Sequence, residues 1–179
     1  MPYDYTTLKG LASDVALPAM FVDWDAVATN ALTMAHVAEQ HGKTIRIATK
    51  SVRVPELLRR IMALRQQTFR GIMCYCAPEA QYLCAKGFID ALIAYPIGRS
   101  SDLQLVQEMH ACGTPATLMV DCLDHLEVLN YATSARPQPV CLDIDASLRP
   151  LGKAAHIGVR RSPLRTTSQI EQLIECVVR

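Results

Sequence analysis

The sequence contains no stretch of about 20 consecutive apolar residues, the length that a membrane-spanning helix requires. It also lacks a charge imbalance, because 18 Lys and Arg against 17 Asp and Glu give a formal net charge of +1 at pH 7. We therefore expect no nucleic acid and no membrane as a partner. Residues 1–14 are polar and acidic rather than basic and then apolar, so we expect no secretory signal and a cytoplasmic protein.

The sequence also lacks the cysteine pattern of a disulfide framework or a zinc site. Its seven cysteines are odd in number and scattered through apolar segments, which indicates reduced, mostly buried thiols. Cys74 and Cys76 do not have the two-residue gap of a zinc knuckle, and none of the five histidines stands at metal-ligand spacing. We therefore expect no metal site.

What the sequence does contain is an alternation of short apolar runs and helical patterns after a polar lead-in at residues 1–18. The chain's half-hydrophobic composition is enough to form a core. Strands are predicted at residues 19–23, 45–50, 71–75, 91–95, 116–120 and 140–144. Helices are predicted at residues 26–40 (with Asp25 as the cap), 55–64, 78–86, 100–111, 124–133 and 168–178. Residues 156–160 are predicted to form a loop with some strand character.

This alternation predicts an α/β fold built from βα units. The strands recur about every 20 to 25 residues and are almost continuously apolar, so we expect parallel strands with both faces covered by helices. A Rossmann sheet needs a glycine-rich loop after its first strand, and residues 51–54 contain no glycine. A (β/α)8 barrel is therefore favoured, although a whole one needs about 250 residues. The prediction is a partial (β/α)8 TIM-type barrel of about five βα units.

Lys50 ends the apolar run at residues 45–50. The C-terminal ends of parallel strands carry the active sites of such folds, because the loops that leave the strands converge there. A lysine in this place can react covalently with a carbonyl group. A solvated loop lysine satisfies the same pattern, so position alone leaves both interpretations open. Tyr95 and Asp121 also stand at strand ends, where they could line a pocket or serve the fold alone.

Three stretches, in this order and spacing, carry a resemblance to a known family. They are residues 45–50 (IRIATK), residues 71–74 (GIMC) followed by 78–80 (PEA) and 90–96 (DALIAYP), and residues 142–145 (LDID) followed by 148–152 (LRPLG). Together they resemble the N-terminal barrel of the alanine-racemase-like, fold-type-III pyridoxal phosphate enzymes. Within that family the chain looks most like the branch of D-threonine aldolase, D-serine dehydratase and amino acid deaminase. The resemblance runs from about residue 17 to residue 163.

The resemblance implies a function and two site residues. Lys50 would carry pyridoxal 5'-phosphate as a Schiff base, and the chain would act on D-amino acids as an aldolase or dehydratase. Arg149 matches an arginine that faces the ring nitrogen of the cofactor in this family. Because arginine keeps its proton, the nitrogen beside it would stay unprotonated. Arg149 also fits an ordinary surface loop, and both interpretations stay open.

The sequence departs from the family pattern in several places. Ile47 and Ala48 stand where many relatives have a proline and a histidine. Residues 1–179 correspond to the N-terminal portion of the barrel domain, without the C-terminal βα units, the loops that usually hold the phosphate, or the C-terminal β domain. We therefore expect a truncated chain whose open sheet edges favour a homo-oligomer, such as a dimer.

Two alternatives to the enzyme remain open. The first is a catalytically incomplete barrel fragment or self-associating module without activity of its own. The second is a Rossmann-like protein that binds a phosphate-containing ligand, which the missing glycine loop disfavours.

Overall fold

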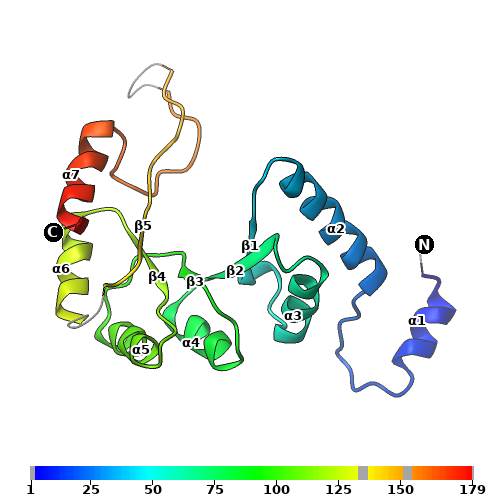
Figure 1. Ribbon diagram of the computed structural model, residues 1–179. Helices are drawn as coiled ribbons and strands as arrows, with labels where there is room; N and C mark the ends of the chain where they lie inside the picture. The colour runs from blue at the N-terminus through cyan, green and yellow to red at the C-terminus, as the bar shows by residue number, and fades with distance from the viewer. Residues whose placement is uncertain (1–2, 133–136, 151–154, 179) are drawn as a thin grey trace.

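The computed structural model describes residues 3–132, 137–150 and 155–178 (Figure 1). It contains one five-stranded parallel sheet in the order β1-β2-β3-β4-β5. The strands are β1 (Ile45–Ala48), β2 (Phe69–Cys74), β3 (Ala91–Ile93), β4 (Thr117–Val120) and β5 (Val140–Leu142). The helices are α1 (Tyr5–Ala12), α2 (Trp24–Gln40), α3 (Pro55–Leu64), α4 (Ala77–Ala85), α5 (Ser100–Ala111), α6 (Leu123–Ala132) and α7 (Thr167–Val178), with a short 3-10 helix, η1 (Thr49–Ser51).

The strand order confirms the predicted fold class. Each of the five strands is followed by a helix, and each pairs in parallel with the next strand along the chain. A doubly wound sheet reverses its strand order partway, whereas a barrel adds its strands in sequence. The sequential order is therefore that of a partial (β/α)8 barrel.

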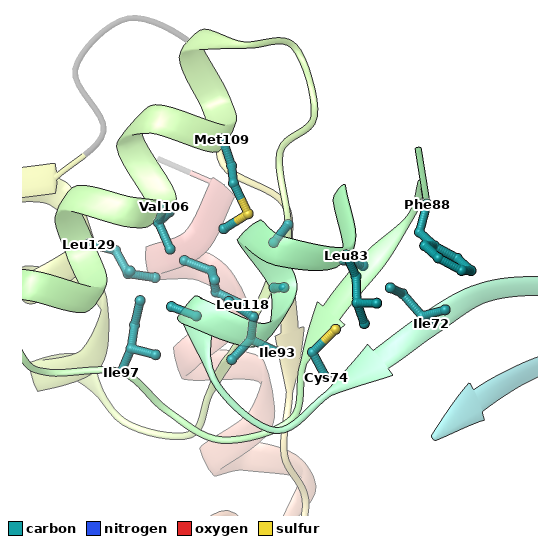
Figure 2. Packing of buried hydrophobic residues seen from close by; sticks show 14 of the residues in the cluster. Ile72, Cys74, Leu83, Phe88, Ile93, Ile97, Val106, Met109, Leu118 and Leu129 are labelled. Carbon is teal, nitrogen blue, oxygen red and sulfur yellow. The ribbon is translucent and has the colours of Figure 1, made fainter. Parts of the chain in front are cut away.

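The core lies between one face of the sheet and the helices α3 to α6. Buried strand residues such as Ile72, Ile93 and Leu118 pack against Leu83 of α4 and Val106 of α5 (Figure 2). A smaller cluster joins α2 and α3 to the start of β2; its buried members are Ala31, Ala35, Ile61 and Phe69. Burial of this apolar surface is the main term that stabilises the sheet.

The prediction that helices cover both faces of the sheet is wrong. Side chains alternate between the two faces of a strand. Ile72, Cys74 and Ile93 are buried beneath the helices, whereas their strand neighbours Met73 and Leu92 are only half-buried. Apolar residues occupy both faces because the second face is the concave side of the barrel wall, which no helix covers in the described residues.

The predicted strand at residues 19–23 is also wrong. This segment forms no strand, and Met20 is 95% exposed. An apolar run needs a neighbouring strand to satisfy its backbone groups, and within the described residues β1 pairs only with β2. Asp23 instead caps α2, because its carboxylate accepts a hydrogen bond from the Ala26 amide at 3.0 Å. The cap is therefore Asp23 and not Asp25.

The remaining differences concern boundaries. The lead-in contains the helix α1, capped by Asp4, which the sequence analysis did not predict. Helices α3 and α5 have the predicted bounds, whereas β3 and β5 end two residues earlier than predicted. Leu148 and Ile157 form an antiparallel bridge, in line with the partial strand character predicted at residues 156–160. The predicted helix end at Thr133 and the motif residues Leu151 and Gly152 lie outside the described residues.

All seven cysteines are free thiols, as predicted, but they are not mostly buried. Only Cys74 is buried, four others are half-buried, and Cys112 and Cys176 are exposed. Burial raises the pKa of the Cys74 thiol to about 12, so this side chain is an inert part of the core. In the part of the chain that the structure describes, no helix has both the length and the apolar character to cross a membrane.

The packing predicts the effect of removing one core side chain. Leu118 is 1% exposed at the centre of the main cluster, so Leu118→Ala should lower the free energy of unfolding by about 2–5 kcal/mol. Met20→Ala, at an exposed position, should change it by no more than about 0.5 kcal/mol. Urea unfolding of both variants measures the difference. Equal midpoints for the two variants would contradict this description of the core.

Candidate active site

Lys50 was predicted to end the strand at residues 45–50, but it lies two residues beyond the C-terminal end of β1, inside the 3-10 turn η1. The turn is attached to the sheet by Thr49, which is fully buried and donates a hydrogen bond from its hydroxyl to the Met73 carbonyl of β2 at 3.0 Å. The Val52 amide closes the turn on the Thr49 carbonyl. Lys50 is therefore exposed on a backbone that is held in place from both sides.

A cavity of about 340 Å³ opens beside Lys50. It lies between the turn η1 and the first turns of α3 and α4, and this volume is typical of a small-molecule site. Arg53, Tyr75 and Tyr82 contribute polar groups to its wall, and Leu58 and Leu83 contribute apolar surface. Glu79 also lines the cavity, and its carboxylate is engaged by the Tyr75 amide. The amine, the guanidinium and the two phenol rings suit an anionic aromatic ligand that carries a reactive carbonyl.

The loop that follows β2 is fixed by a carboxylate. Glu79, in the first turn of α4, accepts a hydrogen bond from the Tyr75 amide at 2.6 Å. The ring of Tyr75 meets the ring of Tyr95 edge to face, with centroids 5.2 Å apart. The guanidinium of Arg161 lies 5.8 Å from the centroid of the Tyr95 ring. Tyr95, which the sequence placed at a strand end, thus packs beside the Lys50 cavity through Tyr75.

Arg149 belongs to a second polar cluster, in the segment that follows β5. Its guanidinium binds the Asp145 carboxylate at 2.7 Å, and Arg165 lies 3.3 Å from the same oxygen. The Asp145 side chain is fully buried and also accepts a hydrogen bond from the Ser147 amide at 3.0 Å. Hydrogen bonding from Ser147 and the charge of Arg149 hold the pKa of Asp145 well below its usual range. Arg149 is thus held by a carboxylate that stays ionised.

His156 lies close to this cluster. Burial lowers the pKa of its imidazole, and the charges of Arg160 and Arg149 act in the same direction. The imidazole is therefore neutral at pH 7 beside a strongly cationic group of residues.

The two predicted site residues do not share the Lys50 cavity. Lys50 lines it together with residues of η1, α3 and α4, and Arg149 is not among its lining residues. Asp121, at the end of β4, is buried and pairs with His125 rather than with Lys50.

Sequence analysis missed most of the residues around Lys50. Tyr75 directly follows β2, so the strand-end rule that found Lys50 also applies to it. Arg53 and Tyr82 gave no comparable signal. They come from a loop and from the side of a helix, and only the packing of α3 beside α4 places them at one cavity.

Comparison with known proteins assigns this arrangement to a family. No curated protein sequence matches the chain. Among solved structures, the chain is similar to the crystal structure of D-threonine aldolase from Filomicrobium marinum, with 24% sequence identity and a TM-score of 0.78. The match covers 93% of this chain and 42% of that chain, and at this identity it establishes the fold. Residues 22–170 match the family described as alanine racemase, N-terminal domain. The chain therefore belongs to the alanine racemase N-terminal domain family.

Proposed function

We propose that this chain binds pyridoxal 5'-phosphate through Lys50 and is part of a lyase that acts on D-amino acids. One observation carries the proposal. The chain belongs to the alanine racemase N-terminal domain family, and its exposed Lys50, just beyond β1, lines a cavity whose wall also includes an arginine and two tyrosines. Lysines are the residues that hold this cofactor in enzymes.

The residues around Lys50 fit the proposed cofactor. Pyridoxal phosphate is an aromatic aldehyde with a dianionic phosphate, and Lys50 would supply the amine that binds the aldehyde carbon. Arg53 lines the same cavity and supplies a cation for the phosphate. Tyr75 and Tyr82 supply ring faces and hydroxyl groups. When bound, the cofactor withdraws electrons from the Cα of an amino acid substrate.

Thr49 and Glu79 act as positioning residues in this proposal. Thr49 fixes the turn that carries Lys50, and Glu79 fixes the backbone that carries Tyr75, each through one hydrogen bond. Preorganised backbone at these two points keeps the lysine and the tyrosine in place without cost at the moment of binding.

Arg149 is proposed as the partner of the ring nitrogen. This assignment rests on the resemblance of residues 142–152 to the family motif and on the ion pair with Asp145, which fixes and orients the guanidinium. A guanidinium that keeps its proton would leave the ring nitrogen unprotonated.

The reaction is proposed at the level of a class. Aldol cleavage of a β-hydroxy-D-amino acid breaks the Cα–Cβ bond, and dehydration removes the Cα proton and the β-hydroxyl, so both reactions would place negative charge on the Cα, which the cofactor would stabilise. The solved relative is a D-threonine aldolase, which favours aldol cleavage for the whole protein. The predicted cytoplasmic location and the absence of nucleic-acid and membrane partners remain predictions.

A second candidate is a self-associating module. In the described residues, the edge strands β1 and β5 each have one neighbour. The concave face also carries half-buried apolar side chains, among them Met73, Leu92 and Met119. Edges and apolar side chains of this kind favour association with a second copy of the chain.

The Lys50 proposal predicts a specific spectral change. After incubation with pyridoxal phosphate and removal of the unbound cofactor, the purified chain should retain a visible absorbance band, and Lys50→Ala should lose it. Lys43→Ala is the matched control, because Lys43 is exposed at the opposite end of β1 and should leave the band unchanged. A band of wild-type intensity in Lys50→Ala would rule out Lys50 as the anchor.

The Arg149 proposal predicts a change in pH dependence rather than a loss of binding. Arg149→Ala should keep the visible band but make it titrate near neutral pH, because the ring nitrogen can then gain a proton. Asp145 retains Arg165 as a partner in this variant, which should preserve the fold. Arg160→Ala, a nearby exposed arginine, should behave like the wild type. Spectra that stay identical to wild type across the pH range would refute the role of Arg149.

Self-association predicts a dimer in solution. Size-exclusion chromatography with light scattering should give twice the mass of one chain. Met119→Glu should shift the protein to the single-chain mass, because the substitution places a charge on the concave face. Met20→Lys, at an exposed position outside the sheet, should remain dimeric, and circular dichroism should confirm that both variants fold. A wild-type chain at single-chain mass would contradict the dimer.

A further inference from the structure

The end of β4 carries a group of metal-ligating side chains that the proposed pyridoxal phosphate site does not use. Asp121 follows β4 directly, Cys122 comes next, and His125 lies in the first turn of α6. One potential ligand atom from each residue lies within 4.8 Å of the other two. The spacing is produced by the sharp passage from strand to helix, which folds position i+4 back over position i.

His125 presents its Nδ1 atom to Asp121. Its Nδ1 atom lies 2.9 Å from an Asp121 carboxylate oxygen, which accepts hydrogen bonds, and 3.4 Å from the Asp121 backbone N–H, which donates them. A protonated Nδ1 donates to the carboxylate, whereas an unprotonated Nδ1 offers a lone pair beside that negative charge. A metal ion between Nδ1 and the carboxylate would use the lone pair and the negative charge together.

The surroundings are those of a coordination site with one open position. The Asp121 side chain is 9% exposed and that of His125 is 28% exposed, so both groups are largely withdrawn from water. A cavity of about 490 Å³ adjoins them, and its wall includes Asp121, Cys122 and Cys176 of α7. A metal ion held by three protein ligands would thus face this cavity with its fourth position.

The chemical types of the three ligand atoms indicate which metal ion the group would bind. A carboxylate oxygen, a thiolate sulfur and an imidazole nitrogen form a mixed set that suits Zn²⁺, whereas Mg²⁺ and Ca²⁺ prefer oxygen ligands alone. Tetrahedral zinc with bonds of about 2.0–2.3 Å separates its ligand atoms by about 3.3–3.8 Å. The ligand atoms now lie no more than 4.8 Å apart, and His125 Nδ1 lies 2.9 Å from an Asp121 carboxylate oxygen, so small side-chain movements would reach this geometry.

We infer that Asp121, Cys122 and His125 form a zinc-binding site at the C-terminal end of β4. The site joins the strand to the first turn of α6 and leaves one coordination position open toward the cavity beneath α7. It is separate from the cavity at Lys50, because the two cavities share no lining residue.

Cobalt substitution tests the inference, because Co²⁺ bound to a thiolate gives a sulfur-to-metal charge-transfer band. The chain of residues 1–179, free of pyridoxal phosphate and stripped with a chelator, is titrated with Co²⁺ and then with Zn²⁺. We expect one Co²⁺ per chain, a charge-transfer band together with the visible bands of a tetrahedral ion, and displacement by one equivalent of Zn²⁺.

Variants assign the ligands. Cys122→Ser should abolish the charge-transfer band, and His125→Ala should weaken Co²⁺ binding at least tenfold. Cys112→Ser removes an exposed thiol elsewhere and should leave the titration unchanged. Circular dichroism and the visible band with pyridoxal phosphate show whether each variant is folded. A charge-transfer band that persists in folded Cys122→Ser, or a wild-type chain that binds no Co²⁺, would overturn the site.

Discussion

The burial of one face of the parallel sheet beneath α3 to α6 is the constraint on which the rest of the structure depends. Ile72, Ile93 and Leu118 hold three neighbouring strands against the helices and so fix their register. Because all five strands run in the same direction, this packing brings the ends that carry Lys50 and Asp121 to the same edge of the sheet. The packing of the core therefore determines where the candidate site residues lie. The polar groups at this edge need only short local contacts, such as the Thr49 hydrogen bond to β2, to take their final positions.

The polar residues at this edge fall into separate groups rather than one. Lys50 lines a cavity between α3 and α4, whereas Arg149 lies in the segment after β5 and is held by the buried Asp145. The chain belongs to the alanine racemase N-terminal domain family and covers 42% of the solved D-threonine aldolase that it resembles. In a barrel, strands added beyond β5 would curve back toward β1. Closure of that kind is the simplest way to bring Arg149 and Lys50 to the same cofactor.

Much of this could be predicted from local sequence, and the failures have identifiable causes. The apolar run before Lys50 and the proline at the start of α3 are local signals, and both elements begin at the predicted residues, although the strand ends at Ala48, two residues before Lys50. Residues 19–23 carry an equally apolar run, but a strand requires a partner that the sequence of the strand does not specify. The cavity residues Arg53 and Tyr82 depend on the packing of two helices. The grouping of Asp121, Cys122 and His125 depends on a strand-to-helix turn, which spacing rules for single helices or zinc knuckles do not describe.

The central claim is that Lys50 is the anchor of an aldehyde cofactor, and the most direct measurement locates the bond itself. The chain is incubated with pyridoxal phosphate, reduced with borohydride, digested and analysed by mass spectrometry, which identifies the modified lysine among the five in the sequence. The account predicts one pyridoxyl group per chain, on the peptide that contains Lys50. Modification spread over several lysines, or concentrated on a lysine other than Lys50, would contradict it.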